Sequence, residues 1–379
     1  MALTKDFGFG PDEQLVRDQA RKFLKDSFPI DTLRALVAKD HREAYESPVQ
    51  PAAWDRDLWK QMVELGWTGL AVPESAGGLG MKTIVAATLV EEVARVAAPS
   101  PLPATLMATM VLREAGATGA LGRIAGGEAA TLAITPESGS WEPGDTDVEV
   151  RGGKLHGRAA FVQDARKADF FVVSARGPAG VGLYAVAANA PGLTITPDRI
   201  VDLTRDQATL SFDGVQVDAG AIVAPEGRGA AVVEAALPAL LSLLAADLCG
   251  AGEWQLQATA EYARTRVQFE RPIGFFQAVK HPIVNMMIAV DRARSLTYAA
   301  ACAVDHEPED ALRLARMAKA AASDAAAFCS DRSVQLHGGI GFTWECDVHL
   351  YFKRQKHTEQ LFGSGAYQRA KLANLLDAA

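Results

Sequence analysis

The spacing of apolar residues changes twice along the chain. Over the first 128 residues, apolar side chains recur every three or four positions, as at Leu15, Ala20, Phe23 and Leu24. This interval is that of an α-helix with one buried face. It predicts helices over about residues 12–27, 54–65, 81–96 and 101–115.

Residues 129–218 show a different pattern, with short apolar runs between glycine, proline and aspartate. Runs at about ten-residue intervals are typical of strands. Two of them, 148–150 and 154–157, flank Gly152-Gly153, which predicts a hairpin. Further strands are expected at 131–134, 170–174, 182–187, 193–195 and 209–212. We interpret this part as a small β-barrel or sandwich.

After Gly229 the helical interval returns, and it predicts helices over 230–265, 281–306, 311–336, 348–361 and 366–376. The predicted fold class is therefore α+β, mostly α. It has an N-terminal helical domain (1–128), a central β-domain (129–228) and a C-terminal helical bundle (229–379).

Composition and charge restrict the function. Hydrophobic residues make up 49% and charged residues 22% of the 379 positions, as in an ordinary globular protein. The 38 Lys+Arg and 46 Asp+Glu residues give a net charge of −8. Because neutralising phosphates needs a basic surface, we do not expect a nucleic acid as partner.

The longest apolar run, 235–246, is shorter than the roughly 20 residues that a membrane span needs, so we expect a buried helix there and no membrane span. The first residues lack a basic stretch followed by an apolar one, so no signal peptide is expected. Cys249, Cys302, Cys329 and Cys346 are widely spaced without a CxxC pair, so we expect reduced thiols in the cytoplasm and no metal site.

Three segments carry residues suited to chemistry. The first, 65–80, is a glycine-rich loop between helices, most of which is interpreted as a structural connection. The second, 264–277, places arginines beside Phe269, Phe275 and Phe276, and guanidinium groups next to aromatic rings suit a pyrophosphate and a planar ring. The third, 335–343, contains a glycine-rich turn that lets the backbone approach a diphosphate.

Taken together, these segments resemble the acyl-CoA dehydrogenase flavoprotein family over nearly the whole chain. VPESAGGLG at 72–80, followed by Glu91-Glu92, is similar to its N-terminal hallmark. YARTRVQFERPIGFFQAVKH at 262–281 resembles its Tyr-x-x-x-Arg-x-x-Phe-Gly-x-x-Ile-x-x-x-Gln signature, and QLHGGIGFTWECDVHLYFKRQK at 335–356 its third signature.

The resemblance implies an oxidoreductase of lipid β-oxidation that binds FAD at a subunit interface and removes hydrogen from the α and β carbons of an acyl-CoA. It implies as partners the acyl-CoA substrate, an electron-transfer acceptor, and a homologous subunit or a second copy of the chain. By motif match, the adenosine-diphosphate end of FAD would be held by Arg266, Phe269, Phe276, Gln277, Gln335, Gly338 and Gly339.

The chain departs from the family where the catalytic base is expected. In most members a glutamate follows the third signature, but here Phe362 falls on that position. Some members carry the glutamate on the first bundle helix, and here Leu240 falls on that one. Glu359 and Glu234 lie nearby and are interpreted as ion-pair or solvated residues, so the catalytic residue is unknown.

Departures also occur elsewhere in the flavin site. The segments 134–141 and 161–163 differ from the sequences that usually flank the flavin ring, and Glu270 replaces the glycine expected after Phe269. The adenosine half, which the resemblance implies would bind the FAD of a neighbouring subunit, matches the family signatures more closely.

Four readings follow. The chain is a base-lacking subunit of a hetero-oligomeric acyl-CoA dehydrogenase, which we favour, since some bacterial enzymes acting on steroid-like acyl chains resemble this arrangement. Alternatively, it is a self-sufficient homo-oligomeric dehydrogenase with a relocated base, an inactive acyl-CoA-binding or scaffold protein, or a flavin monooxygenase on the same fold. FAD content and turnover of the chain alone separate these readings.

Overall fold

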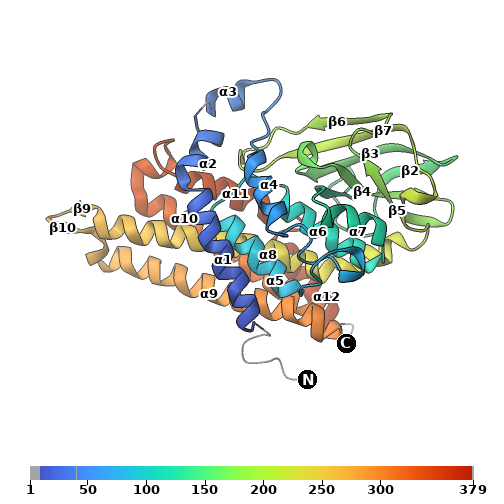
Figure 1. The fold of residues 1–379 in the computed structure, drawn as a ribbon. Coiled ribbons are helices and arrows are strands. Elements are labelled where there is room, and N and C mark those ends of the chain that lie inside the picture. The colour runs from blue at the N-terminus through green and yellow to red at the C-terminus, as the bar shows by residue number, and fades with distance from the viewer. Residues whose placement is uncertain (1–8, 40, 378–379) are drawn as a thin grey trace. The chain divides into compact units, whose positions relative to one another are not determined.

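A computed structural model describes residues 9–39 and 41–377, and the chain divides into two compact units (Figure 1). One unit contains the residues up to 38, then 83–98, and those from 241 onward, whereas the other contains 39–82 and 99–240. The division falls inside one helix, between Leu240 and Leu241. The two units are described separately below.

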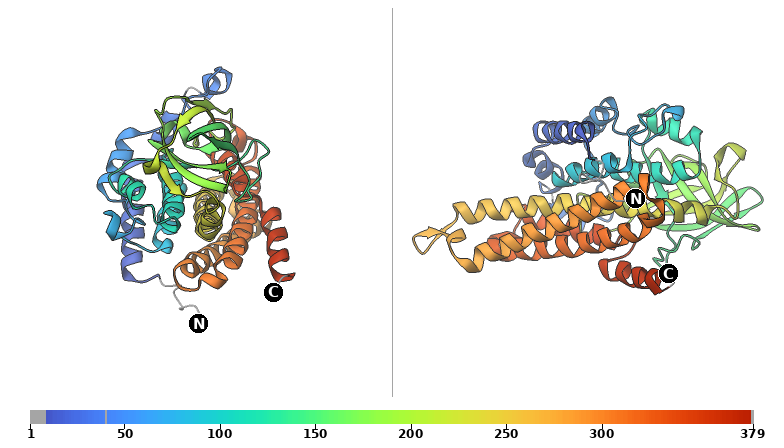
Figure 2. Two further views of the ribbon diagram at one scale, coloured as in Figure 1. Left: turned by 90° about the vertical axis from the view of Figure 1, so that its right-hand side faces the viewer. Right: turned by 90° about the horizontal axis from the view of Figure 1, so that it is seen from below.

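The first unit is helical. Its N-terminal part contains α1 (Pro11–Ser27), α2 (Ile30–Val37) and α5 (Thr83–Arg95). Its C-terminal part contains α8 (Gly229–Thr265, from Leu241 onward), α9 (Gln277–His306), α10 (Pro308–His337), α11 (Val348–Gln360) and α12 (Gly365–Asp377). The distal part of α8 runs alongside α9 and α10 in both views (Figures 1 and 2).

Small side chains allow these helices to pack closely. In α9 and α10, alanines such as Ala300, Ala303, Ala315 and Ala318 are fully buried. In α8, a Cβ atom added at Gly250 would lie 2.1 Å from the carbonyl oxygen of Glu91 in α5. Glycine therefore sets the distance between α8 and α5.

Helix α8 is the one described helix that is long and apolar enough to cross a membrane by length and composition. Its most apolar window has a mean hydropathy of 1.9, but 78% of that window is buried within the protein. The run 235–246 belongs to this buried helix, which is what the sequence predicted.

The helical unit also buries charges in pairs. Arg354 of α11 and Asp247 of α8 form an ion pair of 2.7 Å, and their side chains are 0% and 2% exposed. Thr358 donates a second hydrogen bond to the Asp247 carboxylate. Because a buried charge is costly without a partner, this pair restricts how α11 can sit on α8.

The second unit combines helices with a sheet. Its helices are α3 (His41–Glu46), α4 (Arg56–Glu64), α6 (Leu102–Glu114) and α7 (Thr118–Ala125). Its strands are β1 (Ala130–Ala133), β2 (Asp147–Arg151), β3 (Lys154–Gln163), β4 (Phe170–Gly177), β5 (Gly180–Ala187), β6 (Leu193–Pro197), β7 (Gln207–Gln216) and β8 (Ile222–Ala224). They form one mixed sheet in the order β6-β7-β3-β2-β4-β5-β8, with β1 added on β4.

One face of this sheet carries the apolar core of the second unit, to which Leu155, Phe171, Val173, Leu210 and Phe212 belong. Strand β4 pairs in parallel with β1 and β2, whereas the other pairings are antiparallel. The hairpin predicted at Gly152-Gly153 is confirmed, with φ of 57° and 73° at its two glycines.

The predicted order of helices, then strands, then helices is confirmed. The sequence missed α2, α3, α7 and β8. Each is eight residues or shorter, and α7 contains Gly119 and Gly122, which are poor helix formers. The exact boundaries at 128 and 228 stay predictions.

Candidate functional site

The second signature forms an exposed hairpin after the last turn of α8. Strands β9 (Val267–Gln268) and β10 (Arg271–Pro272) are joined by Phe269 and Glu270. Both joining residues have positive φ, 54° and 65°, the combination that a two-residue turn of type I′ requires. The turn presents Phe269 with 83% of its surface exposed.

Aromatic rings and cations gather behind this turn. The Phe276 ring lies 5.9 Å from that of Phe269 and 5.6 Å from that of Phe275, both edge to face. The Arg271 guanidinium lies over the Phe275 ring at 4.2 Å, and the Lys280 ammonium lies 5.8 Å from the same ring. The predicted association of arginine with aromatic rings is therefore present in the second signature.

The third signature lies at the end of α10. Gln335, Gly338 and Gly339 are exposed. Gly338 has φ 64° and ψ −145°, a backbone conformation that is essentially confined to glycine. A Cβ atom added at Gly338 or Gly339 would have nothing within 4 Å. The backbone of this turn is therefore open to a ligand.

A stacked pair connects the second and third signatures. The rings of Tyr262 and His337 lie 4.3 Å apart, and the Tyr262 hydroxyl donates to the His337 carbonyl oxygen at 3.4 Å. Burial lowers the pKa of His337, although its ring also hydrogen-bonds the Ser333 carbonyl at 2.8 Å. The His337 residue is largely buried in this stack, with 8% of its surface exposed.

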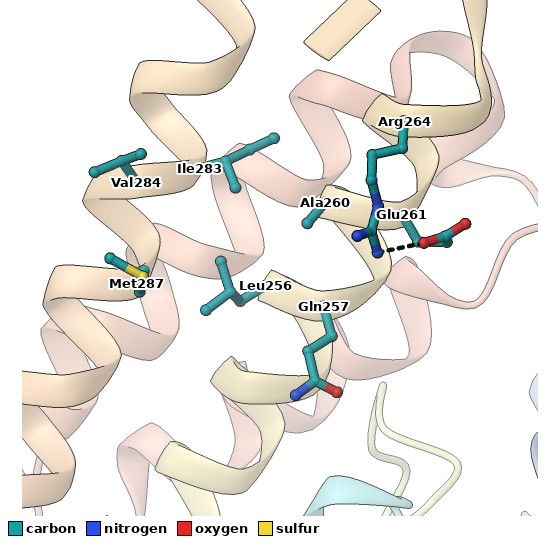
Figure 3. Close-up of a pocket in the computed structure, with 8 residues that line it drawn as sticks. All are labelled: Leu256, Gln257, Ala260, Glu261, Arg264, Ile283, Val284 and Met287. Atoms are coloured by element: carbon teal, nitrogen blue, oxygen red, sulfur yellow. Dashed lines mark hydrogen bonds and ion pairs between the residues drawn. The ribbon is translucent and has the colours of Figure 1, made fainter. Parts of the chain in front are cut away.

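An apolar groove of about 510 Å³ lies beside the second signature, between α8 and α9 (Figure 3). Its wall is mostly aliphatic, and it is lined by Leu256, Gln257, Ala260, Glu261, Arg264, Ile283, Val284 and Met287. Val284 and Met287 are each 45% exposed, and Ile288 beside them is 56% exposed. Arg264 forms an ion pair with Glu261 at the polar rim.

The two altered flavin-side segments lie together in the second unit. The Ala160 amide donates to the Thr135 carbonyl at 2.8 Å, which joins 134–141 to the segment before Gln163. Phe161 occupies a bulge in the pairing of β3 with β7 and has a φ of 57°, which is rare for a bulky residue. Such outliers cluster at ligand sites, and this one lies in the segment that the resemblance placed beside the flavin ring.

Neither of the two positions where the family carries its glutamate offers a carboxylate in this chain. Phe362 is 7% exposed and Leu240 is fully buried. The Glu359 carboxylate accepts from Gln355 at 2.7 Å and lies 3.7 Å from the Lys356 ammonium. Glu234 is an exposed residue of α8. The catalytic residue remains unassigned.

Glu91 and Glu92 were recognised in the sequence only as part of the N-terminal hallmark. In the structure, both are buried and form ion pairs. Glu91 accepts from Arg294 at 2.7 Å and from the Tyr298 hydroxyl at 2.9 Å. Glu92 pairs with Arg21 at 2.7 Å. Since each carboxylate is saturated by cations or hydroxyls, we assign them a structural role in joining α5 to its neighbours.

Comparison with known proteins identifies the family. Residues 227–376 match the family model described as acyl-CoA dehydrogenase, C-terminal domain, and residues 10–119 match acyl-CoA dehydrogenase, N-terminal domain. The chain belongs to the acyl-CoA dehydrogenase family, whose members are FAD-dependent flavoproteins. The resemblance inferred from the three signatures is thereby confirmed.

Individual relatives agree with this assignment. The chain is 32% identical to acyl-CoA dehydrogenase IpdE2 of Mycobacterium tuberculosis, over 88% of this chain and 92% of the relative. A variant of the Tcur3481-Tcur3483 steroid ACAD matches with a TM-score of 0.84 and 28% identity, covering 98% of this chain and 99% of the other. The ChsE4-ChsE5 complex from Mycobacterium tuberculosis matches with a TM-score of 0.83 and 27% identity, covering 99% of both chains.

The residues of the first unit fit the adenosine-diphosphate part of FAD. The open backbone at Gly338 and Gly339 suits a diphosphate, and the exposed Phe269 ring suits a planar base. Arg266 and Gln277 are exposed on the same signature and can donate to phosphate or ring atoms. This fit follows from the exposure of these side chains, from the hydrogen-bond donors that they carry and from the open backbone at the two glycines.

Proposed function

We propose that this chain is a base-lacking subunit of a hetero-oligomeric, FAD-dependent acyl-CoA dehydrogenase. The observation that carries the proposal is Phe362 at the position where most of the family has its glutamate. Leu240, at the alternative position, also lacks a group that can take a proton. A positioned general base contributes roughly 10²–10⁴-fold to a proton-transfer step, so the chain needs a partner to complete this chemistry.

The exposed half-site supports the same proposal. Phe269 and Phe275 are 83% and 57% exposed, although aromatic rings are normally covered in a folded protein. The groove between α8 and α9 adds further apolar surface. Among the matched structures, the names Tcur3481-Tcur3483 and ChsE4-ChsE5 each describe two chains.

In this arrangement the chain contributes to a flavin that it shares with its partner. Arg266 and Gln277 would bind the pyrophosphate, Gln335 with the Gly338-Gly339 backbone would hold the same group, and Phe269 with Phe276 would cover the adenine. When bound, FAD supplies the electron acceptor for α,β-dehydrogenation of the acyl-CoA. The electrons would then pass to an electron-transfer protein, and the complex of this chain with its partner would be the electron donor.

Purification of the chain alone, and together with a candidate homologous subunit, tests the proposal. We expect the chain alone to contain little FAD and to show no dye-linked oxidation of acyl-CoA thioesters. We expect the co-purified complex to contain FAD and to turn over. Full FAD occupancy with turnover by the chain alone would contradict the proposal.

A glutamate substitution in each subunit assigns the base. Replacing the partner's signature glutamate with glutamine should abolish turnover, whereas Glu359→Gln and Glu234→Gln in this chain should leave it unchanged. Loss of turnover with Glu359→Gln would instead indicate a relocated base in this chain. FAD content serves as the control, since it reports assembly independently of proton removal.

A further inference from the structure

A buried lysine lies directly beneath the loop that holds Phe362. Lys319 of α10 is 0% exposed, which is rare for lysine. Its ammonium donates to the carbonyl oxygens of Glu359 and Gly363, at 2.9 and 3.2 Å, and to the Ser323 hydroxyl at 3.3 Å. The two carbonyls lie on either side of Phe362, so one side chain holds both ends of its loop.

The loop itself has an unusual backbone. Phe362 has a φ of 54°, although a bulky aromatic residue rarely adopts the left-handed region. Its carbonyl accepts from the Gln368 side chain of α12 at 2.5 Å. The Arg316 guanidinium, one turn before Lys319 on α10, donates to the other end of the Gln368 amide at 2.8 Å. Two cations of α10 therefore restrain the same loop, one directly and one through Gln368.

The charges around Lys319 leave its own charge weakly compensated. Its three acceptors are two carbonyls and a hydroxyl. On α11, the Glu359 carboxylate opposes the effect of burial but is itself engaged by Gln355 and Lys356.

The other charged groups of α10 and α12 near the loop bind partners other than Lys319. Asp324 binds Arg369 of α12, and Arg316 binds Gln368. From α9, which packs along α10, Arg294 binds Glu91 and Glu253. Burial lowers the pKa of Lys319 to about 7, with the Glu359 charge acting in the opposite direction.

We propose that Lys319 is a positioning residue, which holds the loop 361–364 in the conformation that places residue 362 where most family members carry the base. The catalytic meaning of that position rests on the proposed function, whereas the contact between lysine and loop does not. An ammonium has three N–H donors, which matches its three acceptors here. Because burial lowers the pKa of Lys319 to about 7, opening of the loop above that pH returns the amine to water and takes up a proton, so the closed loop is favoured more as the pH rises.

Hydrogen exchange of the loop amides in the full chain tests the proposal without substrate or turnover. Lys319→Met removes the donors while keeping an apolar stem of similar length. We expect exchange in a peptide spanning about residues 358–368 to become roughly tenfold faster or more, as buried acceptors lose their donor. Lys356→Met is the matched control, because it removes an exposed lysine beside the same Glu359 and should leave exchange unchanged.

Two further measurements separate positioning from general stability. In the wild type, protection of the loop, corrected for intrinsic exchange rates, should increase as the pH rises through about 7, because opening then requires Lys319 to take up a proton. In Lys319→Gln, which donates but does not titrate, that pH dependence should vanish. Lys319→Gln also serves if Lys319→Met fails to fold.

Wild-type exchange rates in a folded Lys319→Met would overturn the proposal, and so would equal pH dependence in the wild type and Lys319→Gln. Because FAD content and turnover do not enter these measurements, the proposal about Lys319 can fail while the proposed function of the chain stands. Conversely, absence of a partner subunit would leave the loop result unaffected.

Discussion

Glu270 occupies a backbone conformation that suits glycine. Its φ of 65° lies in the left-handed region, where a side chain costs roughly 1 kcal/mol relative to glycine. The family usually has glycine after the phenylalanine of this signature. The substitution therefore places a strained residue at the tip of an exposed hairpin.

Glu270→Gly should relieve this strain and raise the free energy of unfolding by about 0.5–1 kcal/mol. Urea unfolding followed by circular dichroism measures the change. Glu261→Gly is the control, since Glu261 is exposed within α8 and glycine there should lower stability by about 1 kcal/mol. Equal destabilisation by both substitutions would show that the turn carries no strain.

His337 adds a pH dependence to the stability of the helical unit. Because burial lowers its pKa below 6.5, the unfolded chain binds a proton more readily than the folded one. The resulting stability is complete above about pH 6.5 and is lost as the pH falls from there through the lowered pKa.

His337→Phe should keep the stack on Tyr262 and flatten the stability profile below about pH 6.5. Unfolding in urea at about pH 7.5, 6.5 and 5.5 detects this. His281→Phe, at an exposed position of α9, controls for loss of a histidine in general. The idea fails if His337→Phe loses as much stability towards acid as the wild type.

At the scale of elements, glycine spacing in α8 fixes the approach of α5. Gly250 faces the Glu91 carbonyl, whereas the nearest atom to a Cβ at Gly252 is a Val290 methyl at 3.4 Å. A methyl group of a side chain can move by a few tenths of an ångström, but a backbone carbonyl held in a helix cannot. The two glycines, which are two residues apart in the helix, therefore differ in the side chains that they tolerate.

Gly250→Ala should lower the free energy of unfolding by about 1–3 kcal/mol or more, because α8 must move away from α5. Gly252→Ala should be close to neutral or stabilising, since alanine is the better helix former. Thermal unfolding of both variants under one condition gives the comparison. Similar melting temperatures for the two would mean that α5 and α8 adjust freely.

The order of helices and strands could be predicted from the sequence, because the spacing of apolar residues reflects the buried face of each helix or strand. The hairpin at Gly152-Gly153 was also predictable, because the residues that determine its turn are adjacent in the sequence. The role of Lys319 was not, because a single lysine among the alanines of α10 looks like a solvated residue until α11 and α12 cover it. Its only signal was its place in an otherwise apolar stretch.

The candidate site could be predicted from the sequence where a motif carries it, but not where side chains from distant segments meet in the fold. Phe269, Phe276 and the Gly338 turn followed from signatures. The stack of Tyr262 on His337 joins residues 75 positions apart, and no local pattern announces it. Glu91 and Glu92 were recognised as a motif, but their pairing with Arg294 and Arg21 depends on how α5 sits among α1, α8 and α9.

At the scale of the whole molecule, the proposed assembly needs apolar surface to bury. The groove wall at Val284 and Met287, with Ile288 beside it, presents aliphatic side chains that are 45–56% exposed. A specific interface has an apolar core of this kind, from which charged residues are depleted. The groove adjoins the second signature, so a subunit bound there would also approach the half-site.

Val284→Asp should therefore weaken assembly without unfolding the chain, because the residue is exposed in the isolated chain. A buried, unpaired carboxylate at an interface costs several kcal/mol, which is a loss of roughly a hundredfold or more in affinity. Light scattering after size-exclusion chromatography should show a smaller species and lower FAD content. Val201→Asp, at a 65% exposed position of the other unit, should assemble like the wild type. A Val284→Asp chain that assembles and retains FAD as the wild type does would place the partner on another surface.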